Sequence, residues 1–170
     1  MSFAEAQDEV RGDAPASFMD AALFDRTFDE GMSLVEETAR YLDGLGREES
    51  RELPRSAALL YAGESMRVTT RLMQAASWLL IQRAVREGEM CAEAAAGERY
   101  RLGSKEICFG GPDENLELLP HTLRDLLDRS ERLYRRIARL EEAILSTQTS
   151  TKPPLQAQFE RLQQNFSVVG

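Results

Sequence analysis

The sequence predicts an all-α protein, an antiparallel three-helix bundle with mobile N- and C-terminal tails. Apolar residues recur at helical spacing in three long segments, at about 18–44, 54–92 and 119–146. Leu53-Pro54 and Leu119-Pro120 precede the second and third segments, where proline suits a first helical turn because its missing N–H would be unpaired there. The connections are too short or too irregular to form a sheet, so we expect one bundle over residues 17–146 whose helices run up, down and up.

The first predicted helix has Ser17 or Asp20 as its N-cap and ends near Gly44. Its inner face holds apolar side chains and one glycine at helical spacing: Phe24, Phe28, Gly31, Val35, Ala39 and Leu42. Residues 1–16 mix Asp, Glu, Gly, Ala and Pro without periodicity. We therefore expect these residues to form a disordered N-terminal arm.

The second predicted helix has a core face and additional surface for another contact. One face collects uncharged residues, which we assign to the core: Ala62, Met66, Thr69, Met73, Ala76, Leu80 and Ala84. The opposite face, assigned to solvent, carries Glu64, Arg67, Arg71, Gln74 and Gln82. Trp78 lies within this polar face, and nearby aliphatic residues widen the apolar surface. We predict a homodimer through Val68, Leu72, Trp78 and Leu79, with Trp78 folding over a neighbouring side chain as the alternative.

The third predicted helix contains a sustained heptad pattern. Leucines recur every seven residues and interleave with a second series: Leu119, Leu126, Leu133 and Leu140 with Leu123, Ser130, Ile137 and Ile144. The same helix carries the arginine stripe, which consists of Arg129, Arg132, Arg135, Arg136 and Arg139. A solvated face is the commoner role for such a set, because exposed ion pairs contribute only about 0–1 kcal/mol each. As the predicted protein-binding site, the arginine stripe would suit an acidic partner.

The C-terminal tail, residues 147–170, is predicted to be flexible and to contain one amphipathic segment. The run TQTSTKPP cannot continue a helix because of its two prolines. Beyond it, apolar residues recur at helical spacing and form a candidate docking segment: Leu155, Phe159, Leu162 and Phe166. This segment is too short to be stable alone as a helix, so it either packs back on the bundle or docks into a partner's groove.

Composition argues against several classes of partner. The formal net charge of −8 and the sequence pI of about 4.8 disfavour attraction to nucleic acid or to anionic lipid. No window approaches the roughly 18 consecutive apolar residues that a membrane span requires, so we predict no membrane insertion and a cytoplasmic protein. The two cysteines, Cys91 and Cys108, are then expected to stay reduced.

The sequence predicts no catalytic, cofactor or metal site. The only histidine, His121, lies in the first turn of the third helix, where a cap or surface role is much commoner than catalysis. Cys91, Cys108 and His121 do not have zinc spacing, and no fourth ligand accompanies them. No phosphate-binding loop is predicted, because the glycines do not lie in a GxxxxGK[ST] motif or in a GxGxxG motif that follows a strand. These patterns favour a protein-binding module over an enzyme.

The three predicted helices contain FDEGMSLVEETARYLDG, LPRSAALLYAGESMRVTTRLMQAASWLLIQRAVREGEM and LLPHTLRDLLDRSERLYRRIARLEE. These segments resemble the helices of the alphaproteobacterial RcdA family, the regulators of CtrA degradation, over about residues 18–146. The resemblance implies a small, commonly dimeric three-helix bundle that acts as an adaptor for the ClpXP protease. It also implies a ClpXP-associated priming protein and cargo response regulators such as CtrA as partners, and transient association with a cell pole. It implies no catalytic or cofactor residues.

Two hypotheses for the function follow. The first is a non-enzymatic adaptor that links a primed ClpXP protease to cell-cycle regulators such as CtrA for degradation. The alternative is a polar scaffold, a structural interaction protein with no delivery role. A reconstituted degradation assay separates them, because only an adaptor raises the turnover of cargo.

Overall fold

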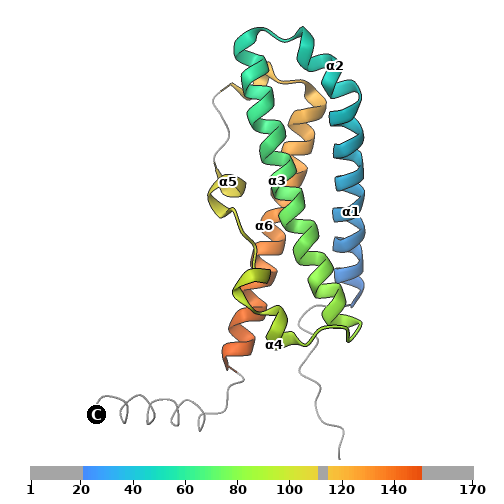
Figure 1. The fold of residues 1–170 in the computed structure, drawn as a ribbon, viewed down its shortest axis with the longest axis vertical. Coiled ribbons are helices and arrows are strands. Elements are labelled where there is room, and N and C mark those ends of the chain that lie inside the picture. The colour runs from blue at the N-terminus through green and yellow to red at the C-terminus, as the bar shows by residue number, and fades with distance from the viewer. Residues whose placement is uncertain (1–20, 111–114, 151–170) are drawn as a thin grey trace, which may run out of the picture.

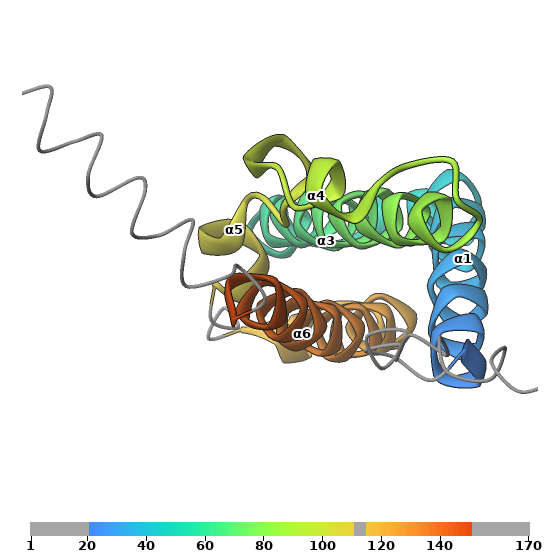
Figure 2. The ribbon, with the colours of Figure 1, turned by 90° about the horizontal axis from the view of Figure 1, so that it is seen from below.

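The regular elements of the protein are all helical in the computed structural model, which describes residues 21–110 and 115–150. Three long helices form the bundle: α1 (Ala21–Asp43), α3 (Arg55–Arg86) and α6 (His121–Ser150). Shorter helices and two 3-10 turns connect them: α2 (Leu45–Glu52), α4 (Ala92–Ala95), η1 (Glu98–Tyr100), α5 (Lys105–Phe109) and η2 (Leu116–Leu118). Figures 1 and 2 show α1 on one side of α3 and α6, and α5 on the other. The predicted all-α class is confirmed.

The long helices run up, down and down. α1 is antiparallel to both others, because Asp25 near its start contacts Arg86 at the end of α3 (3.2 Å). Likewise, Glu37 near its end contacts Arg129 in the first half of α6 (2.7 Å). α3 and α6 are parallel, since both begin at the same end of the bundle (Figure 1). The predicted up-down-up order is wrong because the connection over residues 87–120 is long enough to return along the bundle.

Glycines mark two of the helix ends. The Gly44 N–H donates to the carbonyl oxygens of Arg40 and Tyr41 at 3.1 and 3.2 Å, which closes α1, and α2 begins at the next residue. α3 ends at Arg86, earlier than the predicted end near residue 92. Gly88, shortly afterwards, has a φ of +76°, a left-handed conformation that glycine adopts without steric cost. The chain leaves the axis of α3 there and continues toward α4.

The heptad pattern of α6 forms the centre of the core. Leu123, Leu126, Leu133 and Ile137 are fully buried, which confirms the predicted pattern at these positions. α1 approaches α3 closely at Gly31, where an added Cβ would lie only 2.8 Å from Leu79 Cδ1. A larger residue at that position would have to displace the Leu79 side chain.

The two faces of α3 are the reverse of the prediction. Its buried face contains Ala57, Tyr61, Glu64, Val68, Arg71, Leu72, Ala75, Trp78 and Leu79. The predicted core face is on the outside, since Met66 is 73%, Met73 65% and Leu80 53% exposed. Arg71 on the buried face and the neighbouring Gln74 bond the connection to α6, so these polar side chains lie on the inner side of the helix.

Candidate protein-binding surfaces

The part of the chain that the structure describes does not assemble a metal centre. Within it, no three His, Cys, Asp or Glu side chains are placed to hold a metal ion, and no helix is long and apolar enough to cross a membrane. His121, the first residue of α6, is exposed, and both Cys91 and Cys108 are free thiols.

Four side chains, here called the latch, hold the connection between α3 and α6: Arg71, Gln74, Tyr134 and Glu141. Arg71 donates from Nε to the Cys108 carbonyl oxygen at 2.8 Å and from Nη1 to that of Leu127 at 3.2 Å. Gly103 is held from two sides, because its N–H donates to Gln74 Oε1 at 2.9 Å and its carbonyl oxygen accepts from Tyr134 Oη at 3.0 Å. Glu141 Oε1 accepts from the Leu102 N–H at 2.7 Å.

The latch explains why Arg71 on α3 faces the core. Burial lowers the pKa of Arg71, while the Glu131 carboxylate, 3.7 Å from its guanidinium, opposes that shift. The hydrogen bonds to two carbonyl oxygens offset the cost of burying the guanidinium. Sequence reasoning assigned Arg71 and Gln74 to solvent. Their partners lie 29 to 56 residues away in the chain, so no local pattern indicates these contacts.

The exposed face of α3 carries a long uncharged surface, here called the outer stripe. It consists of Leu59, Ala62, Gly63, Met66, Thr69, Thr70, Met73, Ala76, Ser77 and Leu80. Its four largest apolar side chains recur every seven residues and are 53% to 77% exposed: Leu59, Met66, Met73 and Leu80. The Thr69 and Thr70 hydroxyls donate to backbone carbonyl oxygens one turn earlier, at 2.8 and 2.9 Å, so their methyl groups remain for outside contacts. Large apolar side chains exposed at this regular spacing make the outer stripe a candidate contact surface.

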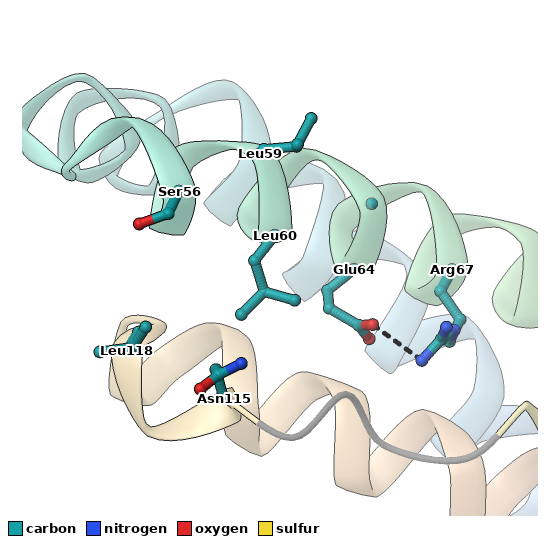
Figure 3. Close-up of a pocket in the computed structure, with 8 residues that line it drawn as sticks. Ser56, Leu59, Leu60, Glu64, Arg67, Asn115 and Leu118 are labelled. Atoms are coloured by element: carbon teal, nitrogen blue, oxygen red, sulfur yellow. Dashed lines mark ion pairs between the residues drawn. The ribbon is translucent and has the colours of Figure 1, made fainter.

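Two hollows lie beside the outer stripe. The first, of about 450 Å³, is lined by residues of α1, α2 and α3: Leu42, Asp43, Arg47, Ser50, Tyr61, Ser65, Met66, Thr69 and Thr70. The second, of about 340 Å³, lies between the start of α3 and the turn before α6 (Figure 3): Ser56, Leu59, Leu60, Gly63, Glu64, Arg67, Asn115 and Leu118. Its floor includes the buried Glu64, which pairs with Arg67 at 2.7 Å. Each hollow shares residues with the outer stripe, so a partner on the stripe also borders them.

The residues predicted to form the dimer interface are buried inside a single chain. Val68 and Leu79 are 0%, Trp78 3% and Leu72 4% exposed. They belong to the core between α3 and its neighbouring helices, so they present no surface to a second copy. The prediction of these four residues as an interface is therefore wrong. Trp78 takes the alternative role within the bundle, and the homodimer itself stays a prediction.

Two members of the arginine stripe join α6 to α1. Arg129 donates from Nη1 and Nη2 to the two carboxylate oxygens of Glu37, at 2.8 and 2.7 Å, and Arg136 pairs with Glu30. The hydrogen bond from the Arg129 guanidinium holds the pKa of Glu37 below its usual range, against the opposing effect of burial. These residues have a structural role between the helices.

The other members of the arginine stripe lie on the surface of α6. Arg132 pairs with Asp128 at 2.7 Å and Arg135 pairs with Glu131 at 2.6 Å, each one helical turn away. Arg139 is exposed. The role of the stripe in binding a partner stays a prediction, and these three arginines are its accessible part.

Two predicted segments lie outside the described residues. One is the N-terminal arm, residues 1–16, and the other is the docking segment of the tail, which contains Leu155, Phe159, Leu162 and Phe166. α6 itself extends to Ser150, past its predicted end near residue 146. The docking role of the tail stays a prediction.

The fold defines the class of the chain as an all-α helical bundle. Residues 15–166 match a family described as a protein of unknown function, DUF1465. The crystal structure of RcdA from Caulobacter crescentus CB15 is similar to this chain, with 56% sequence identity and a TM-score of 0.62 over 75% of this chain and 95% of that chain. No curated protein matches the chain. The chain belongs to the RcdA family, which confirms the resemblance found in its three helices.

Proposed function

We propose that the chain is a non-enzymatic adaptor in regulated proteolysis, which links a primed ClpXP protease to cell-cycle regulators such as CtrA for degradation. The observation that carries this proposal is the similarity to RcdA, with 56% identity over 95% of that chain. The exposed outer stripe and the accessible arginines of α6 support it, because an adaptor works through surfaces that bind other proteins.

An adaptor needs separate surfaces for its different partners. The partners we propose are a ClpXP-associated priming protein, cargo response regulators and a second copy of the chain. The accessible arginines of α6 suit an acidic partner, the outer stripe suits an apolar one, and the amphipathic segment of the tail offers a third contact. The adaptor acts in the cytoplasm and transiently at a cell pole, which a fluorescent fusion followed through the cell cycle tests.

A reconstituted degradation assay tests the delivery role. Purified ClpXP, the priming protein and CtrA are mixed with and without the full chain, and the loss of CtrA is followed with time. An adaptor raises the rate of loss at low concentration and inhibits at large excess, when separate copies occupy protease and cargo. An unchanged rate at all concentrations contradicts the proposal and favours the polar scaffold without a delivery role.

Charge reversal on α6 tests the arginine stripe within this assay. The variant Arg132→Glu with Arg139→Glu leaves the pairs of Arg129 and Arg136 with α1 intact. We expect it to weaken binding of the acidic partner without changing the helical content. The matched control Arg26→Glu with Arg40→Glu makes the same charge change at exposed positions of α1. Equal binding by the variant and the control would remove the arginine stripe from the proposal.

A further inference from the structure

We propose that the surface around α5 is a docking site for an acidic segment of another protein, and that this segment also carries an apolar side chain. The site, here called the α5 corner, lies where α5 packs against α3 and α6. It consists of Arg67, Lys105, Ile107, Phe109 and Arg135. This inference rests on the proposed function and deepens it, because it names the surface and the chemistry with which the adaptor holds one of its partners.

The apolar part of the α5 corner is exposed although the turn that carries it is anchored in the core. Ile107 and Phe109 are exposed, whereas Cys108 between them is fully buried. Two residues apart in a helix, the exposed side chains are separated by about 200° around the axis, so they lie on different sides of α5. A partner segment that contacts both side chains therefore crosses α5.

α5 is held in place before a partner arrives. Arg71 of the latch donates to the Cys108 carbonyl oxygen at 2.8 Å. The Phe109 ring packs edge-on against Tyr134, with 5.0 Å between the ring centroids and 71° between the ring planes. Because these contacts already order the turn, binding loses little conformational entropy there. The latch thus positions a surface as well as closing the connection.

The ion pairs of the α5 corner have their cations nearer to solvent than their carboxylates. Three pairs show this, with the exposed fractions of cation and carboxylate side chains in that order: Arg67 24% and Glu64 4%, Lys105 52% and Glu141 6%, Arg135 56% and Glu131 30%. In the pair between α6 and α1 the order is reversed, since Arg129 is 36% and Glu37 40% exposed. Glu106 on α5 is exposed as well, but the three cations outnumber it. The α5 corner therefore presents positive charge to solvent.

Positive charge and apolar surface lie side by side at the α5 corner. The Arg135 guanidinium lies 5.7 Å from the centroid of the Phe109 ring. On the other side, Gly110 has no side chain to cover Arg67, whose Nη2 lies 3.8 Å from the place of a Cβ at that glycine. A partner carboxylate can thus pair with an arginine while a neighbouring apolar side chain covers Phe109 and excludes water, which strengthens the ion pair.

The net charge of the chain makes the α5 corner selective. The chain has a formal net charge of −8, so most of its surface repels an acidic segment. Arg135 belongs to both the arginine stripe and the α5 corner, so the two surfaces are continuous on α6. Attraction at the corner and repulsion elsewhere direct an acidic segment to this place.

The termini of the chain itself fit the α5 corner less well than another protein does. Residues 151–170 contain Glu160 as their one acidic residue, together with Lys152 and Arg161. Residues 1–20 contain five acidic residues, but α1, which follows them, lies on the other side of α3 and α6 from α5 (Figures 1 and 2). The occupant that we assign is therefore a segment of a partner protein.

Binding of two labelled peptides to the full-length chain tests the chemistry of the site by fluorescence anisotropy. The acidic probe is a short synthetic peptide in which one phenylalanine and one leucine lie among aspartates and glutamates. The neutral probe has asparagines and glutamines in place of these acidic residues. We expect micromolar binding of the acidic probe, at least about 10-fold tighter than that of the neutral probe and weaker as salt is raised. Equal binding of the two probes would contradict the inference.

Removal of charge tests whether the acidic probe binds at the α5 corner. Lys105→Gln with Arg135→Gln is expected to weaken its binding at least about 10-fold. The control Arg26→Gln with Arg40→Gln removes the same charge from exposed positions of α1 and is expected to change the affinity less than about 2-fold. Equal weakening by both variants would mean that the probe responds only to net charge, which overturns the assignment.

Removal of apolar surface tests the role of α5 itself. Ile107→Ser is expected to weaken binding of the acidic probe several-fold, because it removes an apolar contact that binding buries. Leu45→Ser, at a similarly exposed leucine on α2, is the matched control and is expected to bind like the parent. Circular dichroism verifies that each variant keeps its helices. Parent-like binding by the Ile107 variant would remove α5 from the site.

Photo-cross-linking tests the site in the assembled system. A photoreactive amino acid in place of Ile107, in the full chain mixed with purified ClpXP, the priming protein and CtrA, is expected to capture an acidic segment of one of them. Capture of a segment without acidic residues, or no capture while the chain still raises the loss of CtrA, would overturn the inference.

Deletion of residues 1–16 tests the chain's own N-terminal segment as the occupant. We expect the shortened chain to bind the acidic probe like the parent. Binding at least about 10-fold tighter would show that this segment already covers the α5 corner, which overturns the assignment to another protein. The peptide measurements need no protease. Failure of the delivery role therefore leaves them unchanged, and failure of the α5 corner leaves the delivery assay to be judged on its own.

Discussion

Both faces of α3 are rich in apolar residues, and they differ in where the charged side chains lie. The buried face includes Glu64 and Arg71 among its apolar residues, whereas the outer stripe, from residue 59 to residue 80, contains no charge. The buried face contacts α1, α6 and the connection between α3 and α6, while the large side chains of the outer stripe contact solvent in the single chain. The difference teaches that the partners across the bundle, and not the polarity of the face, decide which side of this helix is buried.

The parallel course of α3 and α6 accounts for the polar core face. It requires a connection that returns along the bundle, and buried backbone groups of that connection must find hydrogen-bond partners. Arg71 and Gln74 supply them from α3, while Tyr134 and Glu141 supply them from α6. The outer stripe does not have to supply hydrogen-bond partners to the connection, so its residues can be ones that suit contact with another protein.

Among the substitutions that distinguish the buried face of α3 from the outer stripe, truncation of Trp78 should lower the stability of the chain most. Trp78→Ala is expected to lower the free energy of unfolding by about 3–5 kcal/mol, because it leaves a large cavity in the core. Leu80→Ala, at a position that is 53% exposed, is expected to cost less than about 1 kcal/mol in dilute, monomeric protein. Urea unfolding measures both. Equal losses would show that the assignment of the two faces is wrong.

Removal of the Arg71 guanidinium should loosen the connection while leaving the long helices folded. Arg71→Met leaves the Cys108 carbonyl oxygen without its donor, at about 1–3 kcal/mol for a buried group left unsatisfied, while the Leu127 carbonyl oxygen still accepts from the Ser130 hydroxyl. Hydrogen exchange should become faster in residues 102–108. The control Arg132→Met, at a side chain that is 67% exposed, should change stability by less than about 0.5 kcal/mol. Unchanged exchange in the Arg71 variant would show that the latch does not hold the connection.

The ion pair between Glu37 and Arg129 should contribute a smaller, pH-dependent effect. Because the pKa of Glu37 is lowered in the folded chain, the stabilisation is present above the ordinary glutamate pKa of about 4.3 and is lost as the pH falls through the lowered value. Glu37→Gln should therefore cost less than about 1 kcal/mol at pH 7. The parent and the variant should become equally stable in acid. A difference in urea midpoint that persists in acid would argue against the ion pair as its source.

A change in salt concentration should produce the smallest of these effects, and the quantity that it changes is the dissociation constant of the proposed dimer. Each chain has a formal net charge of −8, so two copies repel, and added salt screens that repulsion over a Debye length of about 10 Å at 0.1 M. The dissociation constant should therefore fall by a few-fold as salt is raised, which sedimentation equilibrium measures. A dimer that weakens with salt would indicate a charged contact, such as the arginine stripe.

Local periodicity was sufficient for the elements whose faces differ clearly. In α6, Leu126 and Leu133 are buried where the heptad pattern places them, because only one side of that helix is apolar. On α3 both sides carry apolar residues at helical spacing, so the pattern cannot choose between Trp78 and Met73 as core residues. The choice depends on the latch, whose contacts are distant in sequence.

From the sequence, the candidate surfaces could be predicted only as sets of similar residues, without the contacts that those residues make. Sequence reasoning identified the arginines of α6, but their pairing with Glu30 and Glu37 depends on how α1 lies against α6. The direction of α6 was missed for a related reason. A connection of this length permits either direction of α6. The hydrogen bonds of Gly103 with Gln74 and Tyr134 fix the connection against the bundle, and no local sequence pattern indicates them.

Hydroxyl-radical footprinting of dilute protein tests the contrast between the faces of α3 most directly, since Met66, Met73 and Trp78 lie on the same helix. In dilute protein, Met66 and Met73 should be oxidised rapidly and Trp78 should be protected. Rapid oxidation of Trp78 in the folded chain, or protection of Met66 and Met73 in monomeric protein, would contradict the account.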